Sequence, residues 1–348
     1  MDQEITPVQD FQKAKVIKIL EEGEKEIFDQ QRSYQLVEVK IIDGKEEGKI
    51  FTINHGDRIN LKDYQKVSTG ETVVLYRGGF DEQIDDFQII DKYRLDNLSF
   101  FVILFFILVL IVSRLKGLGS ILGLIISFFI IIKFIVPQIL AGADPVLITI
   151  TGASAIMLAT IYLSHGLSFK TTVALISTII TLIITGLISI ALLASTKLTG
   201  LGDEAAYGLT LGPQTSNINF QGLLLGGIII GALGVLDDVT TTQTATVFEL
   251  KKTDQNLKLW QLFKKGMVVG KEHISSLVNT LFLAYTGVSL PLLLILILNP
   301  SNTPLWFILN NEPIAQELVR TIAGSMGLIL AVPITTFLAA YFFTKKRV

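Results

Sequence analysis

The chain has 348 residues, of which 50% are hydrophobic and 17% are charged, and it contains no cysteine. Without cysteine, disulfide bonds and thiolate metal sites are excluded. The net charge of −2 is the sum of two different parts: residues 1–96 carry 14 Lys and Arg against 21 Asp and Glu, whereas residues 97–348 carry 15 against 10. This contrast predicts an acidic domain at 1–96, followed by a basic and largely apolar domain at 97–348.

The acidic domain is predicted to be a β-domain. Five segments combine β-branched and aromatic residues with partial alternation, and Gly and Asp turns separate them. The segments are 13–20, 34–42, 49–54, 71–77 and 87–93. Five short strands favour a small barrel of the oligonucleotide/oligosaccharide-binding (OB) shape. The acidic charge argues against nucleic acid as a partner, and His55, which stands alone in a turn, is expected to be solvated rather than a metal ligand.

The second domain is predicted to be an all-α membrane bundle. A segment of about 18 or more apolar residues is typical of a membrane-spanning helix, because lipid cannot satisfy free backbone groups. About seven spans are expected, near residues 98–113, 118–137, 146–163, 171–194, 220–238, 273–298 and 318–343. The lipid bilayer is therefore the first expected partner.

The basic residues predict the orientation of these spans. Twelve of the 15 Lys and Arg residues after residue 96 lie in alternate loops, and such residues concentrate on the cytoplasmic side. We therefore expect a bacterial cell-membrane protein with its C-terminus in the cytoplasm and its β-domain outside. Export of the β-domain needs a signal, but residues 1–11 contain no basic stretch followed by an apolar one. Either the first span is a reverse anchor or, as we favour, a further N-terminal anchor precedes this numbering.

The fifth span combines glycines with an acidic pair, Asp237 and Asp238. Glycines at four-residue spacing are expected to let another helix pack closely; they are Gly222, Gly226, Gly227, Gly231 and Gly234. If the helix continues to Lys251, Asp238 lies 13 residues, about 20 Å, from the basic rim. An ionisable residue at that depth indicates a functional site. The alternative is that the helix stops near Leu236 and that both carboxylates are in cytoplasmic water.

Two later spans place polar residues at a similar depth. The sixth carries His273, Asn279 and Thr280, and the seventh carries Thr335 and Thr336. Together with the acidic pair, these residues would form one polar layer in the inner half of the bilayer. They are the candidate residues for proton or ion coupling.

The acidic pair is expected to have no Lys or Arg opposite it. An unpaired carboxylate in a dry site keeps its proton or holds a cation. Adjacent residues on a helix point about 100° apart, so Asp237 and Asp238 do not both face one small ion. One acid that loads and releases a proton is therefore favoured over a metal site, and no cofactor is predicted. The motifs of intramembrane proteases and phosphate-binding loops are absent, so we do not expect an enzyme.

Two runs carry a family resemblance. They are Gly231-Ala-Leu-Gly234-Val-Leu-Asp237-Asp238-Val-Thr-Thr-Thr-Gln243 and His273-Ile-Ser-Ser-Leu-Val-Asn279-Thr280. With these runs the chain closely resembles the YibE/F family of bacterial membrane proteins, over its whole length. The resemblance implies a multi-pass topology with a small extracytoplasmic β-domain. Longer members of the family usually have an extra anchor before that domain.

A second, local resemblance concerns the fourth and fifth helices of the resistance–nodulation–division exporters and of the SecD/SecF translocation motor. There too a glycine-rich helix ends in Asp-Asp, and a following helix carries Ser-Ser-Leu-x-Asn-Thr. In those proteins the corresponding acid relays protons that drive an external domain. The resemblance implies the same role for Asp237 or Asp238, although this chain lacks the large periplasmic insertions and the basic partner residue.

The sequence therefore predicts a proton-coupled transporter or a force-transmitting module that uses the acidic pair. The alternative is a non-catalytic membrane scaffold or assembly subunit, acting through its external β-domain and a paralogous partner. In either case we expect a homo-oligomer, or a hetero-oligomer with a paralogous family member. The sequence does not specify a substrate.

Overall fold

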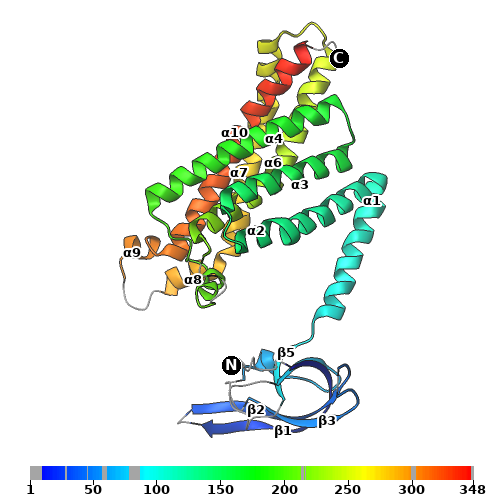
Figure 1. Cartoon of the computed structure of the whole chain (residues 1–348), viewed down its shortest axis with the longest axis vertical. Coiled ribbons are helices and arrows are strands. Elements are labelled where there is room, and N and C mark those ends of the chain that lie inside the picture. Colours follow the sequence, from blue (N-terminus) through cyan, green and yellow to red (C-terminus); the bar gives the residue numbers. More distant parts are fainter. Residues whose placement is uncertain are drawn as a thin grey trace, which may run out of the picture. The chain divides into compact units, whose positions relative to one another are not determined.

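The computed structural model describes residues 10–27, 30–44, 46–56, 61–77, 87–212, 215, 217–298 and 303–345. Lys346 and Arg347, which contribute to the predicted orientation, lie outside the described residues, as do residues 1–9 of the expected signal region. The chain divides into two compact units, residues 1–107 and 108–348. The first contains the strands and the start of a long helix, and the second is helical (Figure 1).

All five predicted strands are present in one antiparallel sheet. They are β1 (Asp10–Ile27), β2 (Gln30–Ile41), β3 (Ile50–His55), β4 (Thr72–Arg77) and β5 (Gln88–Lys92). The strand order is β3-β2-β1-β4-β5, so the long strand β1 pairs with both β2 and β4. The register of β1 against β2 shifts between Val16 and Lys18 and again between Ile19 and Glu21. Such irregularities bend a strand, which curves the sheet around its apolar face.

The sheet is not closed, so the predicted OB-like barrel is not confirmed. Within the described residues, no hydrogen-bonded ladder joins the two outer strands β3 and β5. The two edges approach each other, because the rings of Phe51 and Phe87 meet edge to face with their centroids 5.0 Å apart. Alternate residues point inward, as the period of a strand requires, and Val37, Val39 and Val73 are completely buried.

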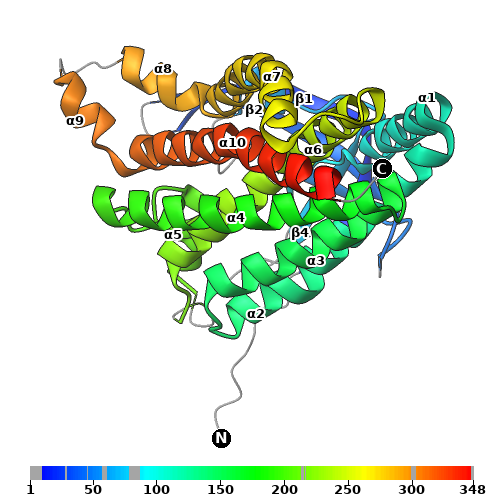
Figure 2. The ribbon, with the colours of Figure 1, turned by 90° about the horizontal axis from the view of Figure 1, so that it is seen from above.

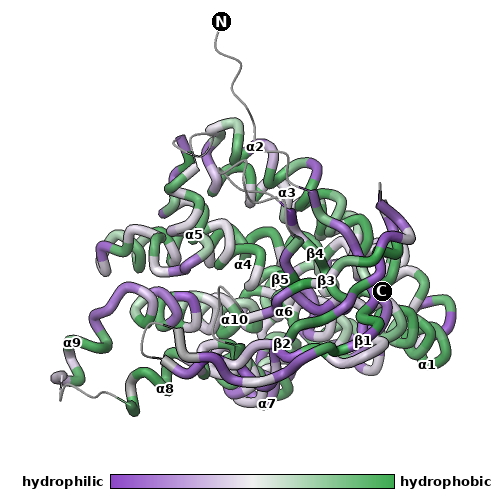
Figure 3. Tube along the Cα trace, turned by 90° about the horizontal axis from the view of Figure 1, so that it is seen from below, coloured by the Kyte–Doolittle hydropathy of each residue, from purple (hydrophilic) through white to green (hydrophobic). Residues whose placement is uncertain are grey.

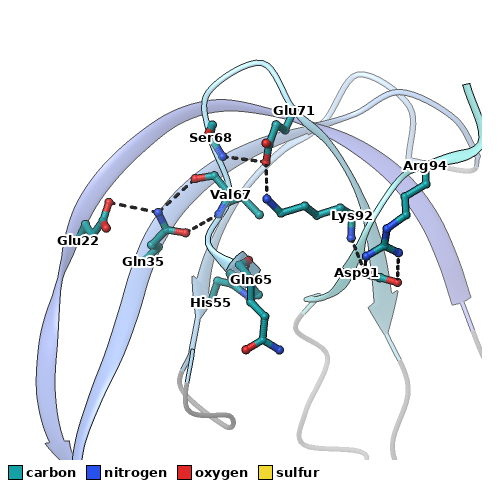
Figure 4. Close-up of polar contacts among 10 residues, drawn as sticks. All are labelled: Glu22, Gln35, His55, Gln65, Val67, Ser68, Glu71, Asp91, Lys92 and Arg94. Carbon is teal, nitrogen blue, oxygen red and sulfur yellow. Dashed lines mark hydrogen bonds and ion pairs between the residues drawn. The ribbon is translucent and has the colours of Figure 1, made fainter. Parts of the chain in front are cut away.

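Two buried polar residues attach the segment before β4 to the sheet (Figure 4). The Gln35 side chain donates to the carbonyl oxygen of Val67 at 3.2 Å and accepts from its backbone N–H at 2.8 Å. His55 Nε2 lies 3.2 Å from the carbonyl oxygen of Gln65, and His55 is only 6% exposed. The prediction that His55 is solvated is therefore wrong, because the segment containing Gln65 covers the end of β3. This burial lowers the pKa of His55.

Five helical stretches of the described chain are long and apolar enough to cross a membrane. The first combines α1 (Leu95–Ile130), the π-helical segment η2 (Ile131–Ile135) and α2 (Val136–Leu140); the others are α3 (Pro145–His165), α4 (Phe169–Thr196), α6 (Phe220–Thr253) and α10 (Glu312–Lys345). Figure 3 shows that α1 is hydrophobic along most of its length, whereas β1 and β2 mix hydrophilic and hydrophobic residues. The chain is therefore an integral, multi-pass membrane protein.

The predicted number of seven spans is not confirmed. The first two predicted spans lie in one of these stretches, in which two helices meet at a kink at Arg114, between the predicted spans; its φ of 51° and ψ of −130° are not helical. The sixth predicted span is divided at Ser289 between α7 (Leu259–Val288) and α8 (Leu290–Leu298), and neither part belongs to the five stretches. The short helices α5 (Glu204–Leu209) and α9 (Leu305–Leu309) lie in the connections.

Helices α4, α6 and α10 pack together at the centre of the helical unit. Figure 2 shows α4 and α10 side by side, with α3 beyond α4 and α7 beyond α10. Glycines set the close approach of α6 to α3. A Cβ atom at Gly222 would lie 2.9 Å from the Pro145 ring, and one at Gly226 would lie 2.7 Å from Thr149 Oγ1. These two predicted packing glycines therefore pack within the chain.

Candidate functional site

A polar cavity of about 710 Å³ lies between α1, α3 and α6. Four of its lining residues are charged or titratable, namely Lys116, His165, Asp237 and Asp238. Seven carry hydroxyl groups: Ser113, Ser120, Ser127, Thr160, Ser164, Thr241 and Thr242. The other three are Val112, Leu124 and Gly234. Charged groups among apolar helices are costly, and in membrane proteins they mark pathways for ions or substrates. The cavity is therefore the candidate site.

Helix α6 carries the two acids of the cavity. It continues without interruption to Thr253, so the alternative that it stops near Leu236 is wrong. Asp238 thus lies 13 residues before Lys251 in one continuous helix, a distance of about 20 Å at 1.5 Å per residue. The acids therefore belong to the wall of the helical bundle and not to a loop.

The two carboxylates differ in their surroundings. Asp237 is half-buried, whereas Asp238 is exposed. The Oδ1 atom of Asp237 is shielded from solvent and has no hydrogen-bond partner among the described residues. Burying a charged oxygen without a partner is unfavourable. This atom is therefore a place where a proton, a cation or an ordered water completes the site.

The other walls of the cavity depend on close contact between α1 and α3. A Cβ atom at Gly119 would overlap the backbone carbonyl group of Leu163, so only glycine permits this approach. One residue further along each helix, the hydroxyl oxygens of Ser120 and Ser164 lie 3.5 Å apart. The contact places hydroxyl groups from both helices beside the acids of α6.

The sequence did not identify Lys116 and His165 as members of the site. Both line the same cavity as the acids, whereas no basic residue was expected there. One signal was present on α1 beyond the bend at Arg114, because Ser120 and Ser127 follow Lys116 by four and eleven residues, a spacing that places them on one helix face. A polar stripe in an otherwise apolar helix indicates that this face does not meet lipid. His165 ends α3, and no local pattern around it points to the acids.

The predicted polar layer is divided in the structure. Of its seven residues, only the acidic pair lines the cavity. Asn279 and Thr280 are exposed on α7, and His273 is half-buried there. The Thr280 hydroxyl donates to the carbonyl oxygen of Ser276 in its own helix. The three α7 residues therefore do not join the acids within this chain.

Thr335 and Thr336 form part of a second, separate cluster in the core. Both are completely buried on α10. The Gln243 side chain donates to Thr336 Oγ1 at 2.7 Å and to the carbonyl oxygen of Gly266 at 3.0 Å. Thr335 Oγ1 has no partner in the part of the chain that the structure describes. This cluster joins α6, α7 and α10, and none of its residues lines the cavity.

The remaining glycines of α6 lie on another face of the helix. A Cβ atom at Gly227 or Gly234 would meet nothing within 4 Å, and one at Gly231 would lie 3.2 Å from the Tyr285 hydroxyl oxygen. Gly234 also borders the cavity. Packing of this face against another chain stays a prediction.

The cavity has few side chains that could bind a metal ion. Within the described ranges, no group of three or more His, Asp or Glu side chains is placed to hold a metal. The possible cation ligands in the cavity are the two α6 carboxylates, His165 and the neighbouring hydroxyls, and Lys116 would repel a cation.

The fold and the cavity define a class: a multi-pass membrane protein whose apolar helices enclose a charged site, with a small β-domain at the N-terminus. Comparison with family models identifies it further, because the model described as YibE/F-like protein matches residues 101–345. The chain belongs to the YibE/F family, which confirms the resemblance seen around Asp237 and Asp238. Neither a curated protein nor a solved structure matches the chain. The local resemblance to resistance–nodulation–division exporters and SecD/SecF stays a prediction.

Proposed function

We propose that this protein is a proton-coupled transporter or force-transmitting module in which Asp237 and Asp238 load and release the proton. The observation that carries the proposal is the cavity of about 710 Å³, which both acids line together with Lys116 and His165. A carboxylate that couples proton movement must be reached by water and must also lie among low-dielectric surroundings. The polar cavity in the apolar bundle supplies both conditions.

The residues of the cavity suit different steps. Because Asp238 is exposed, it is the acid that water reaches first. The Oδ1 atom of Asp237 is shielded from solvent, which suits the state that holds the proton. Lys116 supplies a positive charge that stabilises whichever carboxylate has released its proton. His165 lines the same cavity, and its imidazole nitrogens can relay protons to or from the solvent.

Transport is favoured over catalysis by the placement of the acids. Adjacent residues on a helix diverge by about 100°, so Asp237 and Asp238 are not arranged as an acid and a base on either side of one bond. We further propose that the cavity faces the cytoplasmic half of a cell membrane and that the β-domain lies outside. Lys251 and Lys252 at the end of α6 support this orientation.

Proton flux into vesicles tests the proposal. The full chain is reconstituted into vesicles that contain a pH-sensitive dye, and a pH gradient is imposed. We expect Asp237→Asn/Asp238→Asn to abolish the protein-dependent flux, because asparagine keeps the shape but does not titrate. Asp254→Asn is the matched control, since Asp254 follows the same helix outside the cavity. Full flux in the double variant, or no flux above that of protein-free vesicles with the unaltered protein, contradicts the proposal.

The open glycine face of α6 favours a second function, that of a scaffold or assembly subunit. Gly227 and Gly234 have free space in front of them, and a helix of a second copy or of a paralogue could approach closely there. In a scaffold the glycine face would be essential and the acids dispensable. The double Asn variant and a Gly227→Leu variant therefore distinguish the two functions.

A further inference from the structure

A second hollow, an apolar groove of about 360 Å³, lies on the surface of the bundle where α4, α7 and α10 meet. Ile180 of α4, Trp260 and Phe263 of α7, and Ile334 and Phe337 of α10 are among its lining residues, all of which are apolar or aromatic. The groove shares no residue with the polar cavity. Its lining suits a hydrocarbon chain and no polar ligand.

Three aromatic rings form one side of the groove. The ring centroids of Trp260 lie 5.7 Å from Phe263 and 6.2 Å from Phe337, and those of Phe263 and Phe337 are 6.3 Å apart. Trp260 is 63% exposed, although it stands in the first turn of α7. Tryptophan is enriched at the interface between hydrocarbon and headgroups, and the exposed position of Trp260 suits that interface.

On two helices, a lysine follows residues of this groove at helical spacing. On α7, Lys264 follows Trp260 by four residues and lies on the same face, and helical side chains lean toward the N-terminus, here toward Trp260. On α10, Tyr341 and Lys345 follow Ile334 by seven and eleven residues, again on one face. The Lys345 ammonium group donates to the Tyr341 hydroxyl at 2.5 Å. Both lysines are exposed.

We infer that this groove binds an anionic glycerophospholipid, with one acyl chain against Trp260 and Phe337 and the phosphate between Lys264 and Lys345. The apolar lining takes the chain, and the lysines lie where the headgroups begin. Juxtamembrane lysines attract anionic lipids, so the charge selects an anionic headgroup over a zwitterionic one. A second copy of the chain is a poorer occupant, because a symmetric contact would bring the same lysines of both copies together.

Quenching of tryptophan fluorescence by brominated lipids tests the site. The chain has two tryptophans, so Trp306→Phe leaves Trp260 as the sole emitter in the full-length protein. The protein is reconstituted into phosphatidylcholine vesicles with a minor fraction of phosphatidylglycerol, and the bromine is placed on one lipid or on the other. At equal fractions of brominated lipid, we expect an apparent affinity at Trp260 at least about fivefold higher for phosphatidylglycerol, the preference that one lysine near the surface can provide.

Two comparisons make the outcome decisive. Lys264→Gln/Lys345→Gln should reduce the preference to nearly one, whereas Lys197→Gln, at the far end of α4, should leave it unchanged. In the protein without lysine substitutions, raising the salt concentration should also weaken the preference for phosphatidylglycerol, because salt screens exposed charges. Equal quenching by the two brominated lipids would overturn the inference. Absence of quenching by either lipid would also overturn it, since a second copy covering the groove gives that result.

Discussion

The side-chain nitrogen of Gln243 lies 2.7 Å from the hydroxyl oxygen of Thr336, inside the helical bundle, where both side chains are almost completely buried. The same nitrogen donates to the carbonyl oxygen of Gly266 at 3.0 Å. One amide therefore joins α6, α7 and α10. Gly266 makes room for Thr336, because a Cβ atom at position 266 would lie only 2.8 Å from Thr336 Cγ2.

Loss of the Gln243 amide should destabilise the bundle modestly. We expect Gln243→Leu to lower the free energy of unfolding by about 1 kcal/mol, since hydrogen bonds between membrane helices are typically worth that or less. Thermal unfolding in detergent measures the effect, and a double-mutant cycle with Thr336→Val isolates the shared bond. Thr246→Val is the control, because among the described residues the Thr246 hydroxyl bonds only within α6, to the carbonyl oxygen of Thr242. Strictly additive effects of the two core substitutions would show that the amide and the hydroxyl are not coupled.

Neighbouring glycines of α6 should respond differently to substitution. Gly226→Leu inserts a side chain where a Cβ atom already lies 2.7 Å from Thr149 Oγ1, and overpacking of this kind costs about 1–3 kcal/mol. The leucine side chain introduced by Gly227→Leu would point into open space, so the single chain should fold normally. If α6 packs against another chain through this face, the second variant should instead lose its oligomeric form. Purification yield and size-exclusion chromatography measure both results, and equal loss of yield in both variants would contradict this difference.

Thiol labelling tests the orientation. The chain has no cysteine, so labelling of a single introduced cysteine is measured without background from other thiols in the protein. We expect a cysteine at Lys258 to be protected from an impermeant reagent in intact cells and one at Glu204 to be labelled. Glu204 is exposed and is preferable to Gly202, where a Cβ atom would lie 2.8 Å from Gln316 Oε1. The reverse labelling pattern would place the β-domain in the cytoplasm.

The β-domain should become less stable in acid through His55. Burial lowers the pKa of His55 in the folded domain, whereas the unfolded chain binds the proton near pH 6.5. The folded state is therefore favoured above about pH 6.5, and this advantage is lost as the pH falls below that value. Limited proteolysis of the full-length protein at pH 8 and pH 5 measures the change. His55→Gln should reduce this pH dependence, and an unchanged dependence would assign it to other groups.

The sequence alone determined the class of the protein and the position of the acidic pair. Strand segments and long apolar helices depend on local periodicity and composition, which the printed residues show directly. A charged pair in an apolar run is equally local, so Asp237 and Asp238 were identified without a structure. The number of spans was not settled in this way. The kink at Arg114 falls at the predicted break between residues 113 and 118, but the division of the sixth predicted span at Ser289 is a backbone feature that no apolar run reveals.

Only the tertiary structure decided which residues share the cavity with the acids. Lys116 and His165 line the same cavity as Asp237 and Asp238 because α3 packs against α6 and α1 approaches α3 closely at Gly119 and Leu163. The same reason separates Thr336 from the acids, since it bonds within the core instead. Helical spacing predicts which side chains share a face of one helix, but the faces that meet are selected by shape and close packing between helices distant in the sequence.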